Sequence, residues 1–180
     1  GNFEAQLLRK ITSKKPILKI PAFISKENSE KLINLKPVLK GKKILFIGNG
    51  PDYFYKGIDI LVDVFKELNK KDPEYKLEII GGWEPKKEWM VEGITFKGIQ
   101  KNISKPIKKS DLYLHLARGE AYGVTILEAM ISSLPVIIAK DIGAREIVSK
   151  VDRNLIVPYD KKKIIKSVED YFNSSNKDKK

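Results

Sequence analysis

The chain has 180 residues, which is enough for one domain with a substantial core and too few for two large domains. A hydrophobic fraction of 42% fits a globular protein, no apolar run is long enough to cross a bilayer, and the first residues lack the basic-then-apolar order of a secretory signal. Because the sequence has no cysteine, disulfides and Cys-type zinc sites are excluded, and redox chemistry does not indicate the compartment. A cytoplasmic domain is the default expectation.

The net charge of +12 raises the question of nucleic-acid binding. Nearly all the basic residues are Lys, whereas proteins that read bases and phosphates depend on the planar, bidentate guanidinium of Arg. The Lys are also spread along the chain, apart from short runs at residues 161–163 and 177–180. We therefore favour a diffuse solvated surface over a nucleic-acid function, and this surface would attract anionic ligands or acidic lipid.

The first forty residues differ from the rest. Pro16, Pro21 and Pro37 interrupt short apolar stretches there, and residues 25–34 predict one short helix. We expect residues 1–40 to form a lead-in that packs on another part of the protein. The expected domain then covers residues 41–174, and residues 175–180 form a basic tail.

From Lys42 onward, predicted strands and helices alternate. Continuous apolar runs suit strands that are buried on both faces, and the segments between them carry apolar residues at helical spacing. The predicted strands cover residues 44–47, 77–80, 94–96, 112–116, 135–139 and 155–157. The predicted helices lie within residues 58–68, 83–92, 103–109, 124–134, 144–148 and 164–172.

This alternation predicts an α/β fold in which parallel strands are joined by right-handed crossovers into a doubly wound, Rossmann-like sheet. In such a sheet, ligands bind outside the carboxyl ends of the strands. The candidate loops are therefore those that follow Ile47, Ile80, Phe96, Leu116 and Ala139.

Residues 118–130 carry the strongest functional pattern. Two carboxylates, Glu120 and Glu128, are separated by seven residues, with a predicted strand before them and a predicted helix beginning between them. Gly123 lets the backbone approach a ligand, and the free N–H groups of Val124 and Thr125 open the helix, whose N-terminus suits an anion. Helical side chains tilt toward the N-terminus, so that the Glu128 carboxylate can point back toward this site and accept hydrogen bonds from a ribose diol.

This segment resembles the signature of the group 1 glycosyltransferases, the family-4 retaining enzymes of the GT-B fold. Six further segments are similar to the family in the same order along the chain, and residues 20–23 resemble the linker that enters the domain. The resemblance identifies the chain as the C-terminal, nucleotide-sugar-binding domain of a GT-B architecture. The six segments are residues 55–61, 79–81, 96–98, 134–137, 143–148 and 155–158.

The resemblance implies roles for individual residues. Glu128 would bind the ribose hydroxyls of a nucleoside-diphosphate sugar, and the implied catalytic residues are Glu120, which would contact the donor sugar, and Lys56, which would neutralise the diphosphate. The other donor-binding positions would be Tyr122, Gly123, Val124 and Thr125 through their backbone N–H groups, Gly98 and Ile99 against the base, and Gly48 and Asn49 near the phosphates.

The family is usually metal-independent, and no Asp-x-Asp metal motif occurs in the sequence, so no metal and no cofactor is expected. The donor would be a UDP-, GDP- or ADP-linked sugar. Asn49 departs from the family because an Arg often stands there beside the Lys. Ser133 and Asn154 replace common Gly residues, and residues 116–117 replace a common Pro-Ser.

Simpler interpretations of the same residues remain open. Glu128 could merely complement the helix dipole, Glu120 could be a solvated loop residue, and Lys56 could be one surface Lys among many. Residues 48–50 lack the third Gly of a dinucleotide loop and fit a turn. For His115, the only His, which ends a predicted strand beside the proposed site, a satisfied structural residue is favoured over a general base, and a contact to sugar or phosphate stays open.

The resemblance thus predicts the donor half of a retaining hexosyltransferase in carbohydrate biosynthesis. A second, N-terminal GT-B domain would hold the acceptor, either in cis or as a separate chain, and the isolated half is expected to be inactive. The full enzyme would be cytoplasmic, and peripheral association with the membrane is an alternative. The alternatives are a non-catalytic nucleotide-sugar-binding subunit, a GT-B epimerase or phosphorylase, and a basic nucleic-acid binder.

Overall fold

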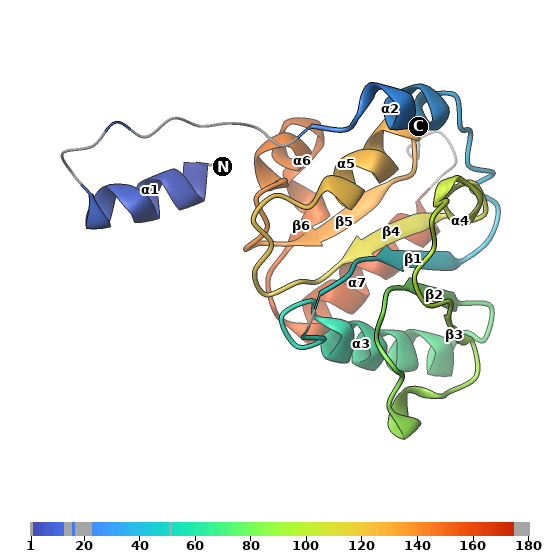
Figure 1. The fold of residues 1–180 in the computed structure, drawn as a ribbon. Coiled ribbons are helices and arrows are strands. Elements are labelled where there is room, and N and C mark those ends of the chain that lie inside the picture. The colour runs from blue at the N-terminus through green and yellow to red at the C-terminus, as the bar shows by residue number, and fades with distance from the viewer. Residues whose placement is uncertain (1, 13–15, 17–22, 51, 175–180) are drawn as a thin grey trace.

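A computed structural model describes residues 2–12, 16, 23–50 and 52–174. Six parallel strands form one sheet with helices on both faces (Figure 1), which confirms the predicted doubly wound fold. In sheet order the strands are β3 (Ile94–Phe96), β2 (Lys76–Ile80), β1 (Lys43–Ile47), β4 (Leu112–His115), β5 (Val136–Ala139) and β6 (Ile156–Val157).

The helices cover the two faces of the sheet in separate groups. α3 and α7 pack together on one face, while α2 packs against α5 on the other (Figure 1). The helices are α1 (Asn2–Ile11), α2 (Lys26–Ile33), α3 (Ile58–Lys71), α4 (Ser104–Lys108), α5 (Val124–Ile131), α6 (Arg145–Val151) and α7 (Lys161–Asn173). Two 3₁₀ turns, η1 (Lys87–Trp89) and η2 (Arg153–Leu155), precede β3 and β6.

Three elements differ from their predictions. α1 was not predicted, although the Pro residues of the lead-in all follow it in the sequence. The helix predicted within residues 83–92 is only the turn η1. α5 ends at Ile131 and does not reach residue 134, because Ser133 adopts a left-handed backbone (φ 59°) that ends a helix, a conformation usually taken by Gly.

Some predictions concern residues outside the described ranges. The basic tail at residues 175–180 and residues 20–22 of the predicted linker are among them. The domain boundaries near residue 40 and residue 174 stay predictions. α2 belongs to the lead-in and packs on α5, so at least this helix of the lead-in lies against the sheet domain.

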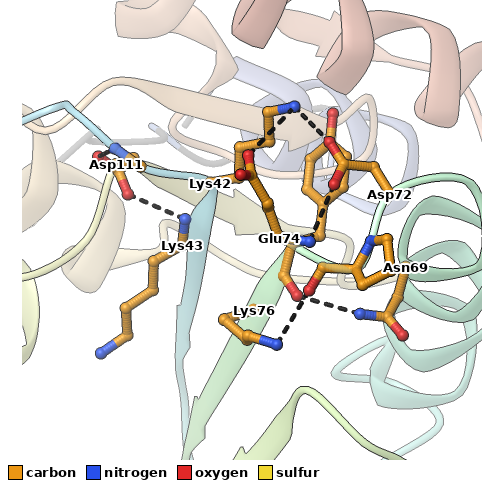
Figure 2. Close-up of polar contacts among 10 residues, drawn as sticks. Lys42, Lys43, Asn69, Asp72, Glu74, Lys76 and Asp111 are labelled. Carbon is orange, nitrogen blue, oxygen red and sulfur yellow. Dashed lines mark hydrogen bonds and ion pairs between the residues drawn. The ribbon is translucent and has the colours of Figure 1, made fainter.

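The amino ends of the strands are held together by polar contacts (Figure 2). The buried carboxylate of Asp111, which directly precedes β4, accepts hydrogen bonds from the backbone N–H groups of Gly41 and Lys43, each at 2.9 Å. The ammonium of Lys42 pairs with Asp72 after α3 and lowers the pKa of that carboxyl below its ordinary value. This end of the sheet is therefore occupied by structural contacts, which leaves the opposite end for a ligand.

We expect the Asp111→Ala variant to be less stable because two backbone donors lose a charged acceptor. A loss of about 2 kcal/mol is expected, since a hydrogen bond to a charged group contributes roughly 1.5–3 kcal/mol and water can reach part of this site. The melting temperature should fall by roughly 4–8 °C, measured by circular dichroism. Asp63→Ala, at an exposed position of α3, is the control and should change stability little. An unchanged melting temperature for Asp111→Ala would contradict this account.

Candidate functional site

The candidate site lies at the carboxyl ends of β1 and β4, where the strand order reverses. β1 is flanked by β2 on one side and by β4 on the other, so that the crossovers leave the sheet in opposite directions at this point. A ligand crevice is expected there in open α/β sheets. The loops that follow the two strands meet, because the N–H group of Arg118 donates to the carbonyl of Tyr55 at 2.8 Å.

Lys56 and Glu120, both predicted from the sequence, come together in this crevice. The Lys56 ammonium lies 2.5 Å from Oε2 of Glu120, and the two side chains are only 21% and 19% exposed. A Cβ placed on Gly50 would lie 3.2 Å from Cε of Lys56, so the loop after β1 borders the same pair. The two groups assigned to the diphosphate and to the sugar are therefore paired with each other in the structure.

Two glycines allow the backbone approaches that position this pair. Gly57 has a φ of 69°, and a Cβ there would lie 2.1 Å from the carbonyl oxygen of Leu116, so that only Gly lets the Lys56 loop pack on the end of β4. A Cβ on Gly143 would lie 2.0 Å from the carbonyl oxygen of Ala121. The Gly143 N–H also donates to the Glu120 carbonyl at 2.9 Å, which fixes the backbone that carries this carboxylate.

Arg118 holds the two loops together, a role that the sequence alone did not indicate. Its guanidinium donates to both oxygens of Asp59 at 2.7 and 2.8 Å and to the Phe54 carbonyl at 2.6 Å. The guanidinium also lies over the Phe54 ring, 3.9 Å from its centre. The sequence offers only one weak signal for this clamp, namely that Arg118 is one of few Arg in a Lys-rich chain.

The Arg118→Lys variant should loosen this clamp, because a Lys ammonium cannot donate in the bidentate geometry of a guanidinium. We expect a loss of about 1 kcal/mol, or roughly 2–4 °C in melting temperature, since the pair is only partly buried. Ligand affinity measured by calorimetry should fall several-fold through the misplaced Lys56 loop. Arg153→Lys, at an exposed position of η2, is the matched control. Equal behaviour of the two variants would contradict the clamp.

The N-terminus of α5 faces the same crevice. Gly123 caps the helix, and the first N–H groups of a helix have no intrahelical acceptor, so those of Val124 and Thr125 are suited to bind an anion. The Thr125 hydroxyl is not available to a ligand, because it lies 2.8 Å from the Tyr113 hydroxyl and 3.2 Å from the Ile47 carbonyl in the core. Thr125 can therefore contribute only through its backbone, and its contact with a ligand stays a prediction.

Glu128 lies just over one turn into α5 and is only 8% exposed. Burial raises the pKa of its carboxyl. Among the described residues, no side-chain or backbone donor hydrogen-bonds to this carboxylate. The Glu128 oxygens are not among the buried side-chain atoms that lack a partner, so this partly desolvated carboxylate remains accessible and can accept hydrogen bonds from ligand hydroxyls.

On the other side of the crevice, the loops after β1, β2 and β3 approach one another around Gly82. A Cβ on Gly82 would lie 3.1 Å from Oδ1 of Asn49 and 3.2 Å from Cδ1 of Ile99. Ile99 is 67% exposed and follows Gly98, whose φ is 63°. Asn49 supplies no charge and uses its side-chain oxygen to accept from the Gly50 N–H. Among the described residues, Lys56 is a cation that lies in the crevice, beside Glu120. Gly82 was not predicted as a site residue.

Other predicted positions contribute to the walls of the site. Gly48 donates its N–H to the Ile80 carbonyl at 3.0 Å, which joins the loop after β1 to the end of β2. Tyr122 is half-buried next to Gly143. The expectation for His115 is wrong in part: Nδ1 contacts the Tyr113 hydroxyl, but the buried Nε2 has no hydrogen-bond partner.

Within the described residues, no group of three or more His, Asp or Glu is placed to hold a metal ion. The helices of the described chain also lack the length and apolar character that a bilayer crossing requires.

Comparison with known proteins identifies the family. The sequence model of the glycosyl transferases group 1 matches residues 27–180, and the chain belongs to this family. The lipopolysaccharide glucosyltransferase WaaG of Escherichia coli (strain K12) is 28% identical over 118 residues, which make up 61% of this chain and 32% of that protein.

Solved structures share the fold. The crystal structure of WaaG, a glycosyltransferase involved in lipopolysaccharide biosynthesis, is similar with a TM-score of 0.75 and 19% identity, over 92% of this chain and 51% of that chain. A mutant of S. aureus TarM in complex with fondaparinux, alpha-GlcNAc-glycerol and UDP has a TM-score of 0.74 and 20% identity, over 95% and 36% of the two chains. The present chain spans about a third of the length of the curated relatives that it matches.

Proposed function

We propose that this chain is the donor-binding domain of a glycosyltransferase that transfers a sugar from a nucleoside diphosphate to an acceptor. The observation that carries the proposal is Glu128, a buried carboxylate without a partner that lies just over one turn from the N-terminus of α5. A ribose diol supplies the two donors that such a carboxylate lacks. The diphosphate would then lie against the α5 N-terminus and Lys56.

In this arrangement the cationic and N–H groups of the site contact the diphosphate, and the carboxylates contact hydroxyls of the ribose and the sugar. Lys56 and the N–H groups of Val124 and Thr125 stabilise the negative charge that grows on the leaving diphosphate. Glu120 accepts hydrogen bonds from hydroxyls of the donor sugar. The base lies near Gly98 and Ile99, where contacts through the backbone allow a UDP-, GDP- or ADP-linked donor.

The reaction retains the anomeric configuration, and a second domain holds the acceptor and excludes water. This domain belongs to the same polypeptide or to a partner chain, and the present half alone binds the donor without turnover. UDP bound to TarM supports a nucleotide ligand for this fold. No metal or cofactor takes part in this scheme.

Calorimetry on the chain tests the proposal with UDP, GDP, ADP and a hexose conjugate of each. One nucleotide series should bind, and the sugar conjugate should bind more tightly than the nucleoside diphosphate alone. Inorganic pyrophosphate and single-stranded DNA are the controls for the net charge of +12. Binding of DNA with a steep salt dependence, together with no nucleotide binding, would favour the nucleic-acid alternative instead.

A further inference from the structure

Trp83 is an aromatic side chain at the crevice that the proposed function has not used. It follows Gly82, around which the loops after β1, β2 and β3 approach one another. The residue is half-buried and packs against the hydrophobic core, so that part of the indole remains accessible to solvent. Ile99, which the proposed function places near the base, borders the same Gly82.

Two glycines let the indole lie across the ends of two neighbouring strands. A Cβ on Gly81, directly after β2, would lie 2.0 Å from Cζ3 of Trp83, and a Cβ on Gly48, directly after β1, would lie 3.6 Å from Cη2. No side chain can come as close as the first distance, so position 81 admits the ring only as Gly. The Phe46 ring of β1 packs against the indole, with ring centres 6.0 Å apart. The indole is therefore held at the carboxyl ends of β1 and β2, where ligands bind in such sheets.

No hydrogen bond accounts for a tryptophan at this position. The indole Nε1 atom is buried and has no partner, although the N–H group of a buried Trp usually finds one. What the ring supplies is a flat, partly exposed aromatic surface, fixed by its packing on Gly81, Gly48 and Phe46. Such a surface suits a planar partner, and the planar group of a nucleotide sugar is its base.

We propose that the Trp83 indole stacks on the base of the donor nucleotide. This contact rests on the proposed function. Ile99 is 67% exposed and reaches Gly82 from the loop after β3, so that its side chain can cover the base from another side. Because every base has a π-face, stacking on Trp83 adds affinity for a nucleoside without selecting one base.

Inorganic pyrophosphate is the reference ligand for this contact, because it resembles the diphosphate of the donor and has no base. The readout is the nucleoside gain, the ratio of the dissociation constants of pyrophosphate and of the member of the UDP, GDP and ADP series that binds. Trp83→Leu should lower this ratio roughly tenfold, since an aliphatic side chain offers no aromatic face, and Trp83→Phe should keep it within about threefold of wild type. Both variants should leave the affinity for pyrophosphate within about twofold of wild type. Trp89→Phe, in the turn η1, is the matched control and should leave the ratio unchanged.

Nuclear Overhauser effects test the contact directly in the wild-type chain. The sequence has two Trp, so that a chain with labelled indole rings gives two N–H signals, which Trp89→Phe assigns. In the complex with the nucleoside diphosphate, the C–H protons of the base should show effects with the Trp83 ring and none with Trp89. A bound nucleotide whose base protons show no effect with Trp83 would overturn the proposal.

The outcomes also distinguish this proposal from the proposed function. If the wild type binds a nucleotide and Trp83→Leu retains the full nucleoside gain, the stacking is wrong while the proposed function stands. If Trp83→Phe and Trp83→Leu lose the gain equally, the ring has only a packing role and the stacking is again wrong. If the wild type binds no nucleotide, the proposed function fails and the stacking fails with it. Should the Trp83 variants be too unstable to study, the effects in the wild-type chain still decide.

Discussion

Glu128→Gln is expected to lower the affinity for the nucleotide sugar by roughly 10- to 100-fold while it raises the melting temperature at pH 7. The loss of affinity follows because the amide replaces a charged acceptor, and a hydrogen bond to a charged group contributes roughly 1.5–3 kcal/mol. The gain in stability follows because burial disfavours the ionised carboxylate, which has no partner among the described residues. The two effects have opposite signs, as expected for a group retained for binding.

The stability difference should depend on pH. Since the pKa of Glu128 is raised in the folded state, its contribution to stability is fully present below the unfolded carboxyl pKa of about 4.3 and is lost as the pH rises through the folded value. The variant should therefore exceed the wild type at pH 7 and lose this advantage near pH 4. Melting curves across this range measure the difference. Glu92→Gln, at an exposed position, is the control.

Equal affinity of Glu128→Gln and wild type for every nucleotide sugar would contradict the role of this carboxylate. A variant that is less stable than wild type at pH 7 would contradict the claim that Glu128 is unpaired in the free protein.

Lys56→Met and Glu120→Gln should change the affinity for a nucleoside diphosphate in opposite directions. Lys56→Met removes the cation of the crevice and should weaken binding at least tenfold, with or without a sugar on the ligand. Glu120→Gln removes the carboxylate that competes for Lys56, so that the diphosphate alone should bind several-fold more tightly. In the same variant, the sugar should add less affinity to that of the nucleoside diphosphate, because the hydroxyls of the sugar lose a charged acceptor.

Calorimetry on the two single variants and the double variant tests this competition. The gain for the diphosphate from Glu120→Gln should disappear in the Lys56→Met background, since no cation remains to be released. Lys108→Met, at an exposed position of α4, controls for the loss of one positive charge. If Glu120→Gln weakens the nucleoside diphosphate as much as Lys56→Met does, the two side chains do not compete.

Most of the fold could be predicted because the apolar pattern specifies it. Runs such as residues 44–47 are buried on both faces of the sheet, and the helical spacing from Ile58 onward matches the buried face of α3. The end of α5 could not be predicted, because only the backbone shows that Ser133 takes the left-handed conformation usual for Gly. α1 was missed although all three Pro residues of the lead-in come after it, so Pro does not explain the miss.

The sequence indicated candidate residues that the structure brings together, but it did not indicate the contacts between their side chains. The spacing of Glu120 and Glu128 and the resemblance to the family led to the crevice at β1 and β4, but neither indicates that Lys56 and Glu120 pair with each other. The Arg118 clamp and the unpartnered nitrogen of His115 depend on contacts between segments far apart in the sequence. Such contacts leave no periodic signal in a single sequence.

The most direct test of the central claim is where a nucleotide sugar perturbs the backbone amides of the chain in NMR spectra. We expect the largest changes at the N-terminus of α5, residues 123–125, with further changes at residues 56–57 and 98–99. Amides near Asp111, at the opposite end of the sheet, should stay unchanged. Changes centred on the amino ends of the strands, or spread evenly over the basic surface, would contradict a donor site at the carboxyl ends of β1 and β4.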